Sequence, residues 1–242
     1  MKNNYYYELI MGYPIYYDKL CIYPISFSTL FKLFGEEMFD YLILPFAITS
    51  EYVKETFNIE TTENNIFNDV IVKNGDMLKN VCLILTAFCK CGQITLSNNI
   101  LHMYDENNEK ILFDVTNDNF NDISDILLKI NAKAKIAIEK PPKNMSARQK
   151  DVWEKLQAGR KREAEKNRIH IYDMINICEF GGDYHIPISE IETWTLWKLT
   201  RCFNSIIGIK EYNDGLKIGI ANYDLSSVQK DNYWVKKMMI RD

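Results

Sequence analysis

The pattern of apolar and polar positions along the chain is mainly helical. Apolar residues recur every three or four positions in most segments, which places them on one face of a helix. Segments 76–88 and 189–207 are apolar on more than one side, which is typical of a buried helix. The pattern predicts helices over residues 29–34, 36–46, 50–57, 66–72, 76–88, 123–130, 146–168, 169–178 and 189–207, and a short final helix from residue 233.

Short alternating runs interrupt the helical pattern and predict strands. Residues 5–15 and 16–25 predict an N-terminal hairpin, and residues 100–104 and 111–115 predict a central hairpin across a polar turn. Residues 93–96 are also strand-like, and residues 216–220 predict a short strand after the turn 213–215. The fold class expected is therefore α+β, mostly helical, with an N-terminal β hairpin and a central β hairpin.

Capping and breaking residues set the expected boundaries. Ser28 is in place to cap the helix that ends at Gly35, and Gly92 to end the helix 76–88. Ser146 with Gln149, and Ser189 with Glu192, fit the capping-box pattern that starts a helix. The pair Pro141-Pro142 stops regular structure, so we expect an N-terminal α+β region over residues 1–140 and a helical C-terminal region over residues 141–242.

The charge is unevenly distributed. The whole chain carries a net charge of −4, yet residues 141–170 hold nine Lys or Arg and only four Asp or Glu, which is +5. The rest of the chain therefore carries −9. The basic segment allows three interpretations: a nucleic-acid-binding helix, a surface for an acidic protein partner, or a solvated helix held by i,i+4 ion pairs.

Catalytic and metal-binding signatures are absent from the sequence. The phosphate loop, the nucleophile elbow, the zinc HExxH pair and the dinucleotide fingerprint do not occur. Cys89 and Cys91 are too closely spaced for a zinc pair, and the acidic turn 105–109 lacks the glycine of a calcium loop. We therefore predict no enzyme activity, no cofactor and no metal, and we interpret the six cysteines as small apolar residues.

Membrane and export signals are also missing. Residues 41–50 and 81–89 are among the longest uncharged, mainly apolar stretches, and both are far shorter than the roughly 20 residues that cross a bilayer. The first eight residues, MKNNYYYE, do not have the apolar run of a signal peptide. We expect a cytoplasmic protein.

The layout of the chain resembles the tail-assembly chaperones of long-tailed phages and prophages of Gram-positive bacteria. The C-terminal half has a basic helix, an apolar helix that ends in glycine, and then WTLWKLTRCF at residues 194–203. The N-terminal half is similar in style at residues 22–30 (IYPISFSTL) and 35–41 (GEEMFDY). The resemblance lies in the pattern of most of the chain rather than in a fixed motif.

This resemblance implies a host-cell cytoplasmic protein that binds the tape-measure protein and tail-tube subunits during assembly. An apolar groove with a charged rim would suit such a client. We expect Trp194, Trp197 and Phe203 as apolar anchors and Arg160, Lys161 and Arg162 as the rim, although helix 189–207 fits a core position as well. The alternatives are a structural phage protein or a nucleic-acid-binding module that uses the basic helix 143–168.

Overall fold

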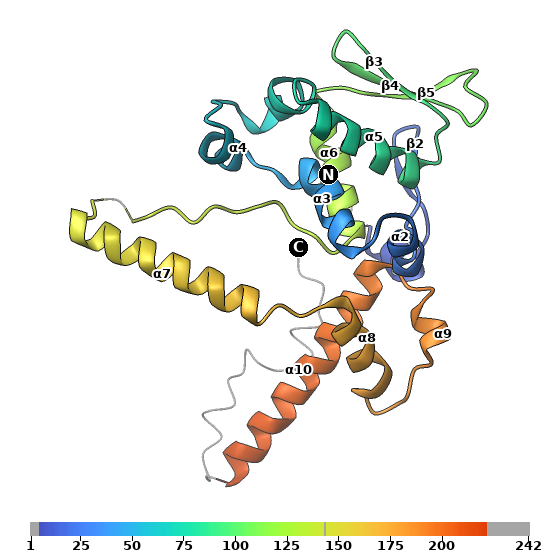
Figure 1. The fold of residues 1–242 in the computed structure, drawn as a ribbon. Helices are drawn as coiled ribbons and strands as arrows, with labels where there is room; N and C mark the ends of the chain where they lie inside the picture. The colour runs from blue at the N-terminus through green and yellow to red at the C-terminus, as the bar shows by residue number, and fades with distance from the viewer. Residues whose placement is uncertain (1–4, 143, 222–242) are drawn as a thin grey trace.

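The computed structural model describes residues 5–142 and 144–221. The protein is 59% helical and holds two small antiparallel sheets, one near the N-terminus and one in the centre of the chain (Figure 1). This confirms the expected α+β class, with both hairpins present.

The N-terminal segment differs in part from the prediction. Residues Tyr6–Met11 form helix α1 instead of a strand, and Gly12 ends it in the left-handed conformation at φ 69°. A glycine reaches this conformation without steric cost and so makes a favourable helix end. The hairpin is shorter than expected and pairs β1 (Ile15–Tyr17) with β2 (Leu20–Ile22).

Helices α2 (Phe27–Phe34), α3 (Glu36–Ala47) and α4 (Ser50–Phe57) follow the predicted pattern. The cap of α2 is Ser26, two residues before the expected Ser28, because the Ser26 hydroxyl accepts the amide of Thr29 at 3.3 Å. Ser28 instead donates its hydroxyl to the carbonyl of Glu192 at 2.8 Å, which ties α2 to the C-terminal region.

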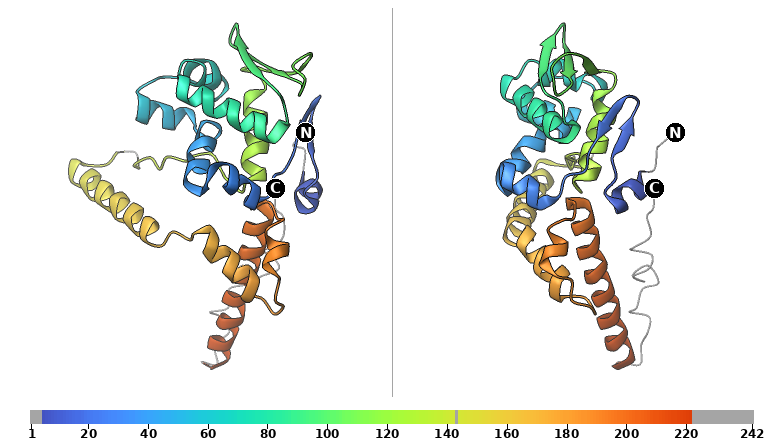
Figure 2. Two further views of the ribbon diagram at one scale, coloured as in Figure 1. Left: turned by 45° about the vertical axis from the view of Figure 1, so that its right-hand side comes forward. Right: turned by 90° about the vertical axis from the view of Figure 1, so that its right-hand side faces the viewer.

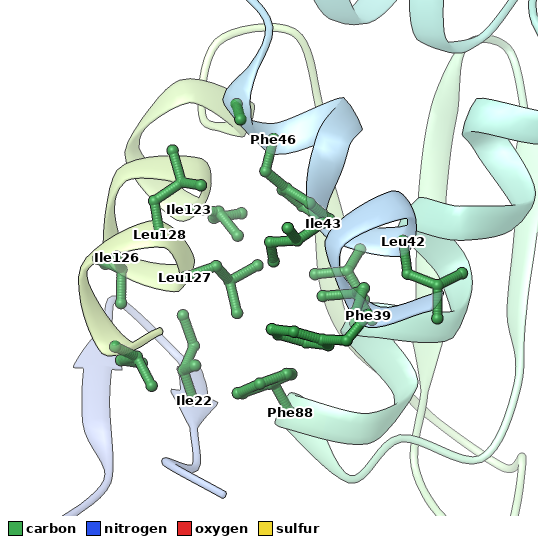
Figure 3. Close-up of a cluster of buried hydrophobic side chains, with 14 of the residues drawn as sticks. Ile22, Phe39, Leu42, Ile43, Phe46, Phe88, Ile123, Ile126, Leu127 and Leu128 are labelled. Carbon is green, nitrogen blue, oxygen red and sulfur yellow. The ribbon is translucent and has the colours of Figure 1, made fainter. Parts of the chain in front are cut away.

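The core lies between α3, α5 (Gly75–Cys89) and α6 (Phe120–Ile130). Figure 3 shows Phe39 of α3 beside Phe88 of α5, and Ile43 of α3 facing Leu127 of α6. Helix α5 ends at Cys89 with Lys90 in the left-handed conformation, so the prediction that Gly92 ends it was wrong. A short 3₁₀ turn (Glu63–Asn65) and a π-helical turn (Phe67–Ile71) precede α5, and the π-helical turn takes the place of the helix predicted over residues 66–72.

The central sheet has the order β3-β4-β5 and is antiparallel throughout. Its strands are β3 (Ile94–Ser97), β4 (Ile100–Tyr104) and β5 (Ile111–Val115). The register pairs Leu101 with Val115, and both are buried against the helices. This confirms the predicted central hairpin, and β3 confirms the strand predicted near residues 93–96. Alternate residues of the sheet therefore lie on one apolar face.

The C-terminal region consists of α7 (Ala147–Lys166), α8 (Ile171–Phe180), the single turn α9 (Ile188–Ile191) and the long α10 (Leu196–Ala221). The capping box expected at Ser189 and Glu192 was wrong, because Thr195 starts α10 by accepting the amide of Lys198 at 3.2 Å. The turn expected at 213–215 and the strand at 216–220 are both part of α10. The helix expected from residue 233 lies outside the described residues.

The two sides of Pro141 share one cluster of buried residues. The amide of Phe27 donates to the carbonyl of Trp194 at 2.9 Å, and Ser26 pairs with Thr195 as an isolated β-bridge. Leu199 on α10 packs in the same cluster as α3 and α6. The two predicted regions are therefore in contact through residues 26–27 and 194–195 and through the shared buried cluster. The division at residue 140 stays a prediction.

Candidate partner-binding site

An arm projects from the helical body and carries the basic segment. We call residues 133–142 and 144–166 the arm: an extended stretch that runs outwards, and α7, which runs back beside it (Figures 1 and 2). The base of the arm is fixed at Ile136, whose amide donates to the carbonyl of Ala47 at 2.7 Å. The carbonyl of Ile136 accepts the hydroxyl of Thr49 at 3.0 Å. The outward stretch is thus attached to the end of α3 and the start of α4.

Local interactions define where α7 begins. The Ser146 hydroxyl accepts the amide of Gln149 at 3.4 Å, and the Gln149 side chain accepts the amide of Ser146 at 2.8 Å. This is the predicted capping box, and it satisfies two of the amides that every helix start leaves without an intrahelical partner. One turn later Lys155 pairs with Asp151 at 2.8 Å. The helix is therefore supported by its own sequence.

Few contacts hold α7 against the rest of the protein. None of its 20 residues, all of which the structure describes, is buried. Its links to the outward stretch are polar: Glu139 accepts Gln157 at 2.6 Å and Arg160 at 3.4 Å. Exposed pairs of this kind contribute at most about 1 kcal/mol each. Helix α7 is thus placed in solvent and not packed into the core.

An apolar strip lies on this solvent-exposed helix. Val152 and Leu156, one turn apart, are 49% and 58% exposed. With Met145 and the half-buried Trp153 they line a hollow of about 310 Å³ whose wall is almost wholly apolar. Side chains at i and i+4 share one helix face, so the strip is continuous. Exposed apolar strips on monomers commonly mark sites of protein contact.

Basic residues lie at both ends of the apolar strip. Arg148 lines the hollow at one end. At the other end Arg160, Lys161 and Arg162 are all exposed, and Arg160 pairs with Glu139 at 3.4 Å. The structure therefore combines an apolar strip and a basic rim on one helix.

The sequence-predicted anchors lie elsewhere. Trp194, just before α10, is 5% exposed, and its indole Nε1 is buried without a hydrogen-bond partner among the described residues. Phe203 is buried as well, whereas Trp197 is half-buried with the Arg201 guanidinium 5.3 Å from its ring centre. The three aromatic residues thus lie at or just before the start of α10, and the three basic residues lie on α7. The structure does not place the predicted anchors and the predicted rim on one element.

The apolar face of α7 could be identified from the sequence. The apolar side formed by Val152, Trp153 and Leu156 follows from helical spacing. Their exposure was not visible, because spacing does not say what covers a helix face. The sequence feature that points to an exposed helix is the contrast between this short apolar strip and the strongly polar residues 160–166 that continue the same helix.

The other candidate chemistry has structural explanations. His102 on β4 contacts Asp114 on β5 at 2.7 Å, a cross-strand pair within the central sheet. The carboxylate of Asp105 accepts the amide of Glu109 at 2.8 Å, which closes the turn that resembled a calcium loop. All six cysteines are free thiols. In the described residues, no group of three His, Cys, Asp or Glu side chains has the geometry of a metal site.

Comparisons with protein-family models, curated proteins and solved structures found no match to this chain. Across residues 5–142 and 144–221, no helix combines the length and apolarity that a membrane span requires.

Proposed function

We propose that this protein binds a helical partner protein through the arm and acts as a tail-assembly chaperone. The observation that carries the proposal is the strip of exposed apolar side chains on α7, a helix with no buried residue. The basic rim favours an acidic partner, and the apolar strip favours an amphipathic helix over a nucleic acid, whose phosphates need cations and not aliphatic groups. The tape-measure protein, taken from the resemblance, is the proposed client, and tail-tube subunits are the proposed second partner.

The strip can supply a useful part of the binding free energy. Full burial of a Leu or Val side chain contributes about 1.5–3 kcal/mol. About half of the surface of Val152 and Leu156 is still exposed in the free protein, so each can contribute about 1 kcal/mol when a partner covers it. Charge pairing at Arg160, Lys161 and Arg162 would mainly speed association and would weaken with salt.

The aromatic residues Trp194, Trp197 and Phe203 have a secondary role in this proposal. Trp194 and Phe203 hold α10 against the body, because both are buried in the shared cluster. Trp197, half-buried on α10, is the one of the three whose ring is still partly accessible to a client. The proposed action is cytoplasmic and involves no catalytic step and no cofactor.

Binding to a tape-measure fragment tests the proposal. The double variant Val152→Gln/Leu156→Gln removes the strip and keeps helix-forming residues. We expect its affinity for the fragment, measured by isothermal titration calorimetry, to fall about thirtyfold, as about 2 kcal/mol requires.

A matched control variant is available on α2. Leu33 is 60% exposed, nearly the same as Leu156, and also lies on a helix. Leu33→Gln is expected to bind the fragment as tightly as the unaltered protein. Equal affinity of all variants would show that the arm is not the client site, and absence of binding by the unaltered protein would remove the tape-measure assignment.

A further inference from the structure

A second hollow lies between the end of α4 and the start of α5. Its volume is about 510 Å³. The apolar part of its lining consists of Phe57, Ile59 and Val70, which come from the end of α4, the loop after it and the π-helical turn. Phe57 and Ile59 are each 37% exposed. The hollow therefore offers an apolar surface that the rest of the chain does not cover.

Two carboxylates and one ammonium group line the same hollow. The ammonium of Lys73 pairs with the carboxylate of Asp69 at 3.6 Å, so these two charges largely offset each other. Asp76 differs, because it is exposed in the first turn of α5 and has no ion pair among the described residues. One carboxylate at the edge of the apolar surface is thus available to an incoming cation.

The surroundings of the hollow are strongly acidic. We call residues 50–76 the acidic segment, because they hold six Asp or Glu and only two Lys, which is −4. This segment already binds one cation of the arm, since the ammonium of Lys140 pairs with the carboxylate of Glu51. Opposite charges attract over distances of about 10 Å at moderate salt, so the acidic segment favours a basic partner.

Helix α7 has the complementary composition. Arg148, Val152, Leu156 and Arg160 follow one another at intervals of four residues, so each is a neighbour of the next on the helix surface. The apolar strip therefore has a cation one turn beyond each of its ends. Arg148 is exposed and has no ion pair among the described residues, whereas Arg160 pairs with Glu139. Such a helix face fits an apolar hollow that is bordered by carboxylates.

The strip and the hollow do not meet within one copy of the chain. No residue of α7 lines the hollow, and none of the 20 residues of α7 is buried. Figures 1 and 2 show α7 and α4 as separate elements, with α7 beside the outward stretch of the arm. Glu139 on that stretch accepts hydrogen bonds from Gln157 and Arg160. A second copy of the chain can therefore supply the surface that each strip does not find in its own copy.

We propose that α7 of one copy docks in the acidic hollow of a second copy, which returns the same contact, so that two chains form a closed dimer. A reciprocal contact uses both strips and both hollows and leaves no open end for further growth. The basic segment carries +5 and the acidic segment −4, so the charges of the two surfaces are complementary. Each contact has few apolar side chains, so the dimer is weak and the arm is free at low protein concentration.

Sedimentation equilibrium of the full chain without any client tests the dimer. We expect a monomer–dimer equilibrium at protein concentrations up to about 0.3 mM, and weaker association when salt is raised to about 0.5 M. Leu156→Gln in the strip and Ile59→Gln in the hollow should each weaken the dimer at least tenfold, because each substitution alters both contacts. Asp76→Asn should weaken it as well, whereas Glu37→Gln, at an exposed acid in the first turn of α3, is the matched control and should not.

Mixing two variants shows which surfaces touch. The Leu156→Gln protein keeps an intact hollow and the Ile59→Gln protein an intact strip, so a mixed dimer has one unaltered contact. An equimolar mixture should therefore associate more strongly than either variant alone. A dimer that Leu156→Gln weakens and folded Ile59→Gln leaves unchanged would show that two strips pack on each other, and would overturn the proposal. An unaltered protein that stays monomeric at about 0.3 mM would overturn it too.

The inference shares the apolar strip with the proposed function, but its test needs no client. A client and a second copy would compete for the strip, so a tape-measure fragment that binds should dissociate the dimer. A dimer that forms while the fragment does not bind would contradict the proposed function alone. A fragment that binds a chain that stays monomeric would contradict the dimer alone.

Discussion

The same substitution should destabilise the protein strongly on α10 and hardly at all on α7. Leu199 on α10 is 0% exposed and packs where α8 meets α10, whereas Leu156 on α7 is 58% exposed. Leu199→Ala removes buried methyl groups and leaves a cavity, which costs about 2–5 kcal/mol. Leu156→Ala removes atoms that already contact water, so its cost should be below about 0.5 kcal/mol.

Urea unfolding followed by circular dichroism measures both values. A cost of about 3 kcal/mol for Leu199→Ala corresponds to a fall of about 6–12 °C in unfolding temperature for a chain of this size. Leu and Ala have similar helix propensities, so the comparison reports packing. A cost above about 1.5 kcal/mol for Leu156→Ala would show that the arm is packed against the body, and the reasoning for an exposed strip would fail.

Three further outcomes follow from other parts of the structure. Burial and a hydrogen bond to Asp122 raise the pKa of Tyr17 to about 12. The free energy of unfolding should therefore fall as pH rises from 10 to 12, and Tyr17→Phe should make this fall smaller. A hydrogen bond with the Cys178 thiol lowers the pKa of Cys202 to about 7. Iodoacetamide should therefore alkylate Cys202 faster than the other cysteines at pH 7, as measured by mass spectrometry, and Cys178→Ala should slow this reaction. A Cβ at Gly92 would lie 2.5 Å from a backbone carbonyl of the facing turn, so Gly92→Ala should lower stability by about 1–3 kcal/mol in the same urea assay.

Elements defined by local chemistry could be predicted from the sequence. The central hairpin alternates half-buried and fully buried residues on β4, and the cap at Ser146 needs only Gln149 three residues later. Predictions failed where distant packing decided the outcome. Asn213-Asp214-Gly215 is a typical turn sequence, but it continues α10, a helix that tertiary contacts with α8 and α6 already support at its start.

The candidate site was predictable only in part. The prediction that residues 160–162 lie on a helix is confirmed, since charge runs and caps are local features, whereas their role as a rim stays a prediction. The aromatic anchors were chosen by residue type, but Trp194 and Phe203 are buried in the folded protein, where α10 contacts α1, α6 and α8. Exposure depends on neighbours far away in sequence, and no spacing rule supplies that information.

Hydrogen–deuterium exchange of the complex with a tape-measure fragment tests the central claim most directly. In the free protein, α7 should exchange fastest among the long helices, because none of its residues is buried. On binding, we predict at least tenfold slower exchange confined to residues 145–166, with β3, β4 and β5 unchanged. A complex that forms while exchange in α7 stays as fast as in the free protein would contradict the account.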